Sequence, residues 1–402
     1  MRRSPALLFV AALVSITLID PFAVLLFLPA LPEVKKAFAI SEAVVGLTFS
    51  VTLLVMAFVT LLYGSLSDRY GRRPVLLAGL VLFTAGGAVS ALAGSVSGLI
   101  IGRIVQALGA GCGVALARVI VRDAYGSDSL VKVIAYLSMG ATLGPMISPL
   151  LGGVLIDTFG WRSILWFAAL AGAIITSLAY AALPETRPAD RIDAGRPGFL
   201  RSYAALFAHP RFTAFVLQTG FSTATFYAMA SASSFLMKDY LSRSATQFGL
   251  YFVLFPAGLF VGHLLSGRLS RHSSIENMVL AGSVINLAAT LSQSAFILGG
   301  YLTPLIIFVP GFLVTFGQGL ALPNAQAGAL RVMPELSGTA AGIGVFFQMF
   351  LGAVFSQVYG LLADGTPIPM VIAASAGSVL TLLAGLTPFV LKRRERAAAS
   401  IR

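Results

Sequence analysis

The chain has 402 residues, of which 57% are hydrophobic and 10% are charged, and its mean hydropathy is +0.91. A soluble domain carries roughly 25% charged residues, so this composition excludes a soluble globular protein and predicts a membrane protein. The net charge of +12 therefore points to loops retained in the cytoplasm and not to nucleic acid. The single cysteine, Cys112, excludes an intramolecular disulfide.

Twelve apolar runs follow one another along the chain, and each is long enough for a membrane-spanning helix of about 20 residues. The runs cover approximately residues 6–31, 42–65, 75–96, 98–122, 130–157, 162–183, 211–236, 245–267, 276–298, 302–330, 336–361 and 368–391. The fold class expected from them is an all-α integral membrane protein.

One long polar segment, residues 184–210, interrupts these runs near the midpoint of the chain. Its prolines, glycines and mixed charges predict a linker between two six-helix halves, residues 1–183 and 211–402, the second of which ends in a basic tail. A short repeat supports the duplication, because Gly267-Arg268-Leu269-Ser270 echoes Gly64-Ser65-Leu66-Ser67 after the second helix of each half. Duplicated halves are typical of secondary transporters.

Lysine and arginine are distributed unequally between the two sides of the membrane. When alternate loops are assigned to alternate sides, one side collects 21 of these residues and the other collects five. Because basic residues are held back from translocation, this bias places both termini and residues 64–74 in the cytoplasm.

Asp20 is the only carboxylate deep within a span, and Arg103 is the matching basic residue, about one turn inside the fourth span. A charge near the bilayer centre costs roughly 2.5–3.5 kcal/mol, so Asp20 is a candidate proton carrier; the alternative is a structural acid held by neighbouring backbone or by an arginine. Helical rise places Arg103 about 8 Å and Asp20 about 16 Å below the outer surface. The two can pair if the first and fourth spans are neighbours; the alternative is that Arg103 snorkels outward.

The fifth span is rich in glycine and proline. Gly140, Gly144 and Gly152 lie at multiples of four residues, which predicts a smooth groove for close helix approach. Pro145 and Pro149 remove backbone donors and favour a bend. These five residues are the candidate hinge.

Polar and aromatic side chains fall on single faces of several other spans. They can line a cavity for an amphipathic solute, or they can form hydrogen bonds between helices, which is the common use of intramembrane Ser, Thr and Gln. The candidate substrate residues are Thr48, Thr52, Gln106, Met146, Gln218, Phe221, Ser222, Thr225, Phe255 and Gln348.

Signatures of catalysis are missing from the sequence. With three histidines and one cysteine there is no metal-ligand cluster, and there is no Gly-x-x-x-x-Gly-Lys phosphate loop. We therefore expect no enzyme activity, no metal and no cofactor, and energy from an ion gradient, from the solute's own gradient, or from neither.

Three stretches resemble signatures of the major facilitator superfamily. Gly64 to Pro74 is similar to its cytoplasmic signature, Gly-x-Leu-x-Asp-Arg-x-Gly-Arg-Arg-Pro. Arg103-x-x-Gln106 followed by Gly109 resembles the fourth-helix signature, and Gly140 to Gly153 resembles the fifth-helix signature of antiporters.

A finer resemblance is to the bicyclomycin/chloramphenicol-resistance branch of drug:proton antiporters. The stretches that carry it are Leu28–Pro32, Arg118–Asp123, Ser231–Phe235 with Gln247–Gly249, and Ser337–Ala341. The chain departs from that branch in one respect: the usual first-helix acid would fall at Leu25, and Asp20 lies five residues earlier.

The resemblance implies two six-helix bundles that open alternately to each side of a bacterial inner membrane. It also implies that Asp68 lies beside the start of the eleventh helix, at Ser337 and Gly338, and that Arg69 or Arg72 meets Asp123. The expected cytoplasmic gate consists of Gly64, Asp68, Arg69, Gly71, Arg72, Arg73 and Asp123.

We therefore expect a monomeric, proton-coupled exporter of small amphipathic compounds such as drugs, with Asp20 as proton carrier and Arg103 as its electrostatic partner. Its partners would be its substrate, protons and the lipid bilayer, with no nucleic acid. The alternatives are a dedicated exporter of one metabolite or siderophore, an uncoupled facilitator, and a non-transporting receptor.

Overall fold

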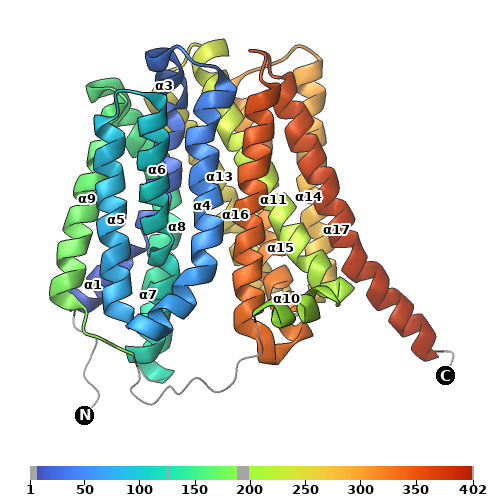
Figure 1. Ribbon diagram of the computed structural model, residues 1–402. Coiled ribbons are helices and arrows are strands. Elements are labelled where there is room, and N and C mark those ends of the chain that lie inside the picture. The colour runs from blue at the N-terminus through green and yellow to red at the C-terminus, as the bar shows by residue number, and fades with distance from the viewer. Residues whose placement is uncertain (1–6, 125–126, 188–198, 401–402) are drawn as a thin grey trace. The chain divides into compact units, whose positions relative to one another are not determined.

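The computed structural model describes residues 7–124, 127–187 and 199–400, and every regular element in these ranges is a helix (Figure 1). Eleven stretches of the described chain are long and apolar enough to cross a membrane. The expected fold class, an all-α integral membrane protein, is confirmed.

Helix α11 (Pro210–Phe235) supplies the remaining span. Its 26 residues are long enough to cross a bilayer. Its serines, threonines and glutamine lower its mean hydropathy, so it is not among the eleven stretches counted above. Because 20 of the 26 residues are buried, these polar side chains face other helices and not lipid. A span turned inward on nearly all sides does not need an apolar sequence.

The contacts divide the chain into two units, each described here by itself. Unit 1 comprises Met1–Ile192 and Met237–Val253, and unit 2 comprises Asp193–Leu236 and Leu254–Arg402. Residues 237–253 thus pack in unit 1, although the chain on both sides of them belongs to unit 2.

Unit 1 contains the helices of the first six spans and the segment 237–253. Its elements are α1 (Leu7–Ile16), α2 (Ile19–Val24), the 3₁₀-helix η1 (Leu25–Ala30), α3 (Leu31–Phe38), α4 (Glu42–Tyr70), α5 (Arg72–Leu92), α6 (Val96–Ala110), α7 (Cys112–Ala124), α8 (Ser127–Phe159), α9 (Arg162–Ala182), the short π-helical η2 (Leu236–Tyr240) and α12 (Ala245–Phe252). Unit 2 contains α10 (Phe199–Phe207), α11, α13 (Leu254–Leu269), α14 (Ile275–Leu298), α15 (Pro304–Val332), the 3₁₀-helix η3 (Pro334–Leu336), α16 (Ser337–Leu362) and α17 (Ile368–Ser400).

The first span is discontinuous. It runs as α1, α2, η1 and α3 in place of one α-helix. Pro29 has no N–H, so it cannot bond the carbonyl of Leu25, and the chain tightens to a 3₁₀-helix over Leu25–Ala30. Asp20 lies in the first turn of α2, between the two breaks.

Helices α5 and α6 of unit 1 pack closely through glycine (Figure 1). A Cβ atom at Gly109 would lie 2.2 Å from the backbone nitrogen of Phe83, and one at Gly86 would lie 2.1 Å from that of Gln106. The two backbones therefore touch directly, as small-residue interfaces allow in membranes.

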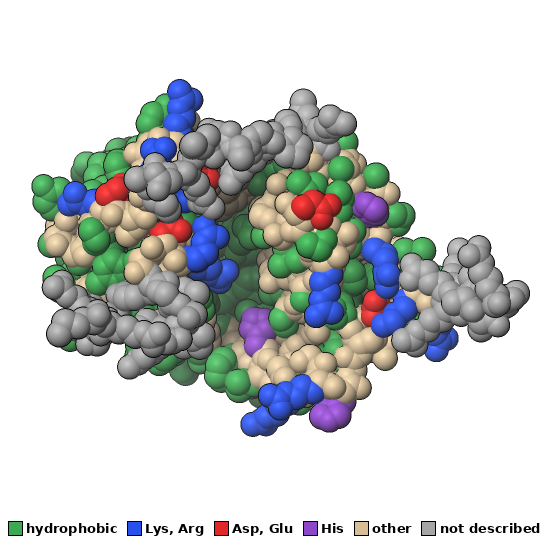
Figure 2. Space-filling view, turned by 90° about the horizontal axis from the view of Figure 1, so that it is seen from below, with side chains coloured by type: hydrophobic (Ala, Val, Ile, Leu, Met, Phe, Trp, Pro, Cys, Tyr) green, Lys and Arg blue, Asp and Glu red, His purple; other side chains and the backbone are tan. Residues whose placement is uncertain are grey.

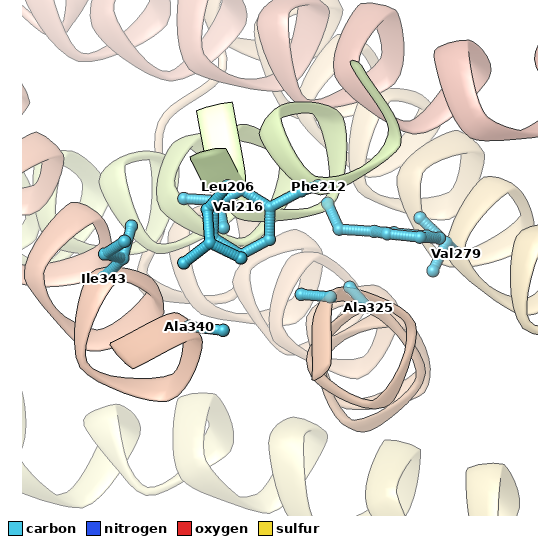
Figure 3. Close-up of a cluster of buried hydrophobic side chains, with 9 residues drawn as sticks. Leu206, Phe212, Val216, Val279, Ala325, Ala340 and Ile343 are labelled. Atoms are coloured by element: carbon cyan, nitrogen blue, oxygen red, sulfur yellow. The ribbon is translucent and has the colours of Figure 1, made fainter. Parts of the chain in front are cut away.

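Helix α10 lies within the segment that the sequence predicted as a polar linker. Leu206 is fully buried in a cluster with Phe212, Val216 and Ile343, which joins α10 to α11 and α16 of unit 2 (Figure 3). The Phe207 and Phe212 rings meet edge to face at 5.7 Å. Apolar residues at helical spacing make this part of the segment a packed helix.

Candidate functional site

Asp20 has an unsatisfied carboxylate oxygen. Its Oδ1 atom is buried and has no hydrogen-bond partner among the described residues. The structure contains no ion pair between Asp20 and Arg103 within the same ranges. A buried polar atom without a partner is unfavourable, so this oxygen is a candidate for the reversible binding of a proton or a ligand.

Arg103 binds backbone and amide oxygens. Its Nη2 donates to the carbonyl of Ala23 at 2.6 Å, Nε to the carbonyl of Thr48 at 3.3 Å, and Nη1 to Oε1 of Gln106 at 2.6 Å. The guanidinium carbon also lies 4.4 Å from the centre of the Phe27 ring.

These contacts join the first, second and fourth spans at one side chain. Only 1% of Arg103 is exposed, so it does not snorkel to the surface. The first and fourth spans are neighbours, as a pair with Asp20 requires, but in this structure the first span offers Arg103 a carbonyl three residues beyond the acid.

Two of the predicted substrate residues of unit 1, Thr48 and Gln106, contact Arg103. Thr48 and Thr52 are fully buried and donate to the carbonyls of Val45 and Thr48 in their own helix. Gln106 is fully buried, and its Nε2 has no partner in the described part of the chain. Met146 is half-buried.

The glycines of α8 face the broken first span. Cβ atoms added at Gly140, Gly144 and Gly152 would lie 2.4, 2.6 and 2.6 Å from atoms of Thr17, Pro21 and Leu26. The groove therefore tracks the first span on both sides of Asp20. Pro145 and Pro149 lie inside α8, which continues through them, and the hinge role stays a prediction.

In unit 2 the predicted residues on α11 make hydrogen bonds to other helices. Gln218 donates to Ser283 of α14 at 3.1 Å, and Ser222 accepts from Asn286 of the same helix at 3.4 Å. Sequence reasoning missed both partners, although Ser283 and Asn286 share one face of an apolar span by their i, i+3 spacing.

The remaining predicted residues of unit 2 differ in exposure. Thr225 and Phe255 are fully buried, and Phe255 packs edge to face on Phe226 and Phe308. Phe221 and Gln348 are half-buried, and Nε2 of Gln348 has no partner among the described residues.

Arg72 is the centre of the predicted cytoplasmic gate. It is 2% exposed, and its guanidinium contacts Asp123 at 3.1 Å, Asp68 at 2.5 Å and Ser67 at 2.6 Å. These contacts fasten the end of α7 to the junction of α4 and α5. Of the two arginines proposed to meet Asp123, Arg72 does so, whereas Arg69 is exposed and lies over the Tyr70 ring.

The predicted contact of Asp68 with Ser337 and Gly338 would join the two units, so it stays a prediction. A Cβ atom added at Gly64 would meet no other atom within 4 Å, so no close contact requires glycine at this position. Figure 2 shows Lys and Arg side chains beside Asp and Glu side chains on the end of unit 1 at which α4 stops and α5 begins in Figure 1.

Glu185, which the sequence placed in the linker, organises the start of α5. Gly71 has a φ of 99°, a conformation available to glycine, and a Cβ there would lie 2.6 Å from Glu185. The Glu185 carboxylate accepts the backbone N–H groups of Arg72 at 2.9 Å and Arg73 at 3.2 Å. Partial burial raises the pKa of Glu185, but backbone donors from Arg187, Arg72, Arg73 and Thr186 outweigh it and hold the pKa below its ordinary value.

The substitution Glu185→Gln is expected to lower the unfolding temperature at neutral pH, since α5 would lose a charged cap. Because the folded-state pKa is depressed, this contribution is present above the ordinary glutamate pKa of 4.5 and is lost as the pH falls through the folded-state value. The difference between wild type and variant should therefore shrink on acidification in thermal unfolding of the detergent-solubilised protein. A difference that stays constant with pH would contradict the assignment.

Comparison with known proteins places this architecture in a family. The sequence model of the Major Facilitator Superfamily matches residues 13–357. Multidrug resistance protein D of Escherichia coli (strain K12) is 28% identical over 383 residues, which cover 95% of this chain and 94% of the relative. The bicyclomycin resistance protein homolog of Haemophilus influenzae is 25% identical over 391 residues, covering 95% and 96%.

Solved structures share the fold. A bacterial homolog of the human lysosomal transporter Spinster superposes with a TM-score of 0.77 at 16% identity, covering 98% of both chains. A D-xylose–proton symporter superposes with a TM-score of 0.75 at 15% identity, covering 94% of this chain and 95% of its own. The family model spans most of the sequence, and the relatives and the fold agree with it. The chain belongs to the major facilitator superfamily and is a multi-pass membrane transporter, not an enzyme.

Proposed function

We propose that the protein exports small amphipathic compounds, including drugs, by alternating access and in exchange for protons. Relatives named for multidrug and bicyclomycin resistance match nearly the whole chain, which supports this substrate class. The observation that carries the proton coupling is the unpartnered, buried Oδ1 of Asp20 in a broken span, near the buried cation Arg103. The proposed setting is a bacterial inner membrane with both termini cytoplasmic, and the proposed working form is a monomer without a cofactor.

Asp20 and Arg103 supply a two-state element. Ala23, which accepts from Arg103, lies three residues after Asp20 and about 4.5 Å along the helix axis, on the same face. A proton leaving Asp20 exposes a negative charge to the guanidinium, an attraction worth several kcal/mol at most in a low dielectric. To move toward the carboxylate of Asp20, the guanidinium of Arg103 must weaken its hydrogen bonds to the carbonyls of Ala23 or Thr48.

Those two carbonyls belong to the first and second spans, so the protonation of Asp20 changes how firmly α6 holds them. The glycine groove of α8 is the surface on which the first span would shift. The ion pairs of Arg72 with Asp68 and Asp123 would keep the cytoplasmic end of unit 1 closed until the first span shifts. Met146, Phe221 and Gln348, which are half-buried, are the predicted residues best placed to meet substrate.

The test is a growth-inhibition panel across drug classes in an efflux-deficient host. Wild type is expected to raise the inhibitory concentration for at least one class of amphipathic compound, and Asp20→Asn at equal membrane expression should fall to the level of the empty vector. Asp364→Asn is the matched control, because this carboxylate lies in an exposed loop and binds Thr366. A wild type that protects against no class would overturn the proposal.

A further inference from the structure

Helix α17 leaves one continuous face uncovered. Exposed positions recur along it at steps of three or four residues, so they form a single stripe on the helix. The opposite face packs within unit 2, where a Cβ at Gly377 would lie 2.5 Å from Oγ1 of Thr225 and one at Gly385 would lie 2.5 Å from Oγ of Ser283. The stripe is therefore the side of α17 that faces hydrocarbon in a bilayer. It consists of Ile372, Ala376, Val379, Leu383, Thr387 and Val390.

Basic residues follow this stripe directly. Residues 392–396 comprise four basic residues and one acid, and α17 remains helical to Ser400. Positions 393 and 394, three and four residues beyond Val390, are the next on the stripe. Arg393 is exposed, and its guanidinium carbon lies 4.6 Å from the centre of the Phe389 ring. Figure 1 shows this end of α17 standing apart from the other helices of unit 2. The face that meets hydrocarbon thus ends in cations.

Two ion pairs indicate the depth of these cations in a bilayer. The carboxylate of Glu276 contacts Arg211 at 2.8 Å and Lys392 at 2.5 Å, and only 10% of the Glu276 side chain is exposed. Glu276 and Arg211 lie in the first turns of α14 and α11, so Lys392 is level with the start of two other spans. Positions 393 and 394 follow about 1.5 and 3 Å further along the helix axis. They are therefore at the boundary at which hydrocarbon gives way to lipid headgroups.

We propose that the end of α17 binds the headgroup phosphate of an anionic phospholipid through Arg393 and Arg394, while an acyl chain of the same lipid lies along the stripe. A guanidinium offers a planar fork of donors that matches two phosphate oxygens. Both oxygens of Glu276 bind other cations, so this acid does not neutralise the two arginines. The excess of basic residues over residues 392–396 favours anionic over zwitterionic lipid. The inference does not depend on what the protein transports.

A lipid bound at this end of α17 would stabilise unit 2. Lys392 precedes Arg393 in the same helical turn and is held by Glu276, which also binds Arg211. Restraining the end of α17 therefore restrains the starts of α14 and α11 through one carboxylate. Because a ligand that binds only the folded protein raises its stability, we expect anionic lipid to raise the unfolding temperature.

The first experiment measures how lipid changes stability. The purified protein in a neutral detergent is titrated with phosphatidylglycerol or with phosphatidylcholine of the same acyl chains, and the unfolding temperature is recorded. Phosphatidylglycerol should raise this temperature more than phosphatidylcholine does. Arg393→Gln with Arg394→Gln should increase the half-saturating concentration of phosphatidylglycerol about 25-fold, which corresponds to about fivefold for each arginine removed.

The matched control for this titration is Arg268→Gln with Arg271→Gln. It removes two exposed arginines of unit 2 that lie outside the proposed site, and it should keep the wild-type affinity. Equal weakening by both double variants would overturn the inference, because it would show a general effect of net charge. An equal rise in unfolding temperature with glycerol phosphate, which has the headgroup without acyl chains, would overturn the assignment to a lipid.

The second experiment locates the lipid. Both native tryptophans are replaced by phenylalanine, Val390→Trp then places a fluorophore on the stripe, and its fluorescence is quenched by lipids with brominated acyl chains. Brominated phosphatidylglycerol should quench it more strongly than brominated phosphatidylcholine, and Arg393→Gln with Arg394→Gln should remove this preference. Leu298→Trp, at a 65% exposed position at the opposite end of α14 from Glu276, should show no preference. Equal quenching by the two lipids at position 390 would overturn the inference.

Discussion

The substitution Asp20→Asn is expected to abolish export driven by a pH gradient and to leave downhill flux of substrate. Asparagine matches the protonated acid in shape but cannot release a proton, so the variant keeps one state of the switch. The charge that draws Arg103 away from Ala23 would never appear. Initial rates in everted membrane vesicles, with and without an imposed pH gradient, measure the effect directly.

Asp20→Glu is the matched variant, because it retains a titratable carboxyl with one additional methylene. It should keep part of the stimulation by the gradient. An Asp20→Asn variant that a pH gradient still drives uphill at the wild-type rate would remove Asp20 from the coupling mechanism.

The substitution Arg103→Met is expected to destabilise the protein by about 2–5 kcal/mol and to eliminate export. Methionine fills much of the volume, but the oxygens of Ala23, Thr48 and Gln106, which bind the buried guanidinium, lose their donor. Thermal unfolding of the purified protein in detergent measures the first effect, and the vesicle assay measures the second.

Arg103→Lys separates charge from geometry. A lysine keeps the positive charge, but its single ammonium cannot reproduce the planar fork that serves two helices at once. We expect partial recovery of stability without recovery of export. Arg268→Met, at an exposed arginine, should change stability by no more than about 0.5 kcal/mol. An Arg103→Met protein that unfolds at the wild-type temperature would contradict this account of the site.

The spans and the family were accessible from the sequence for physical reasons. Twenty-residue apolar runs have no alternative to helix in a bilayer, and the Gly64–Pro74 motif needs Gly71 for the turn and Arg72 for the ion pairs. The sequence also predicted α11 as a span, from the apolar run 211–236, although α11 is too polar to be counted among the eleven strongly apolar helices.

The partners of the charged residues were not accessible in the same way. The acceptors of Arg103 are the carbonyls of Ala23 and Thr48, which every residue type carries, so no pattern of side chains marks them. Lys35 pairs with Asp239, 204 positions later in the chain, and no pattern in the sequence marks these two residues as partners. Helix α10 was missed because its apolar face is short and lies within a polar segment.

The most direct test of the central claim is proton release from the purified protein on addition of an exported substrate, followed with a pH-sensitive dye in weakly buffered detergent solution. Wild type should release protons as substrate binds, and the release should disappear in Asp20→Asn and persist in Asp364→Asn. Equal proton release from wild type and Asp20→Asn, at equal substrate occupancy, would show that the coupling proton is held elsewhere.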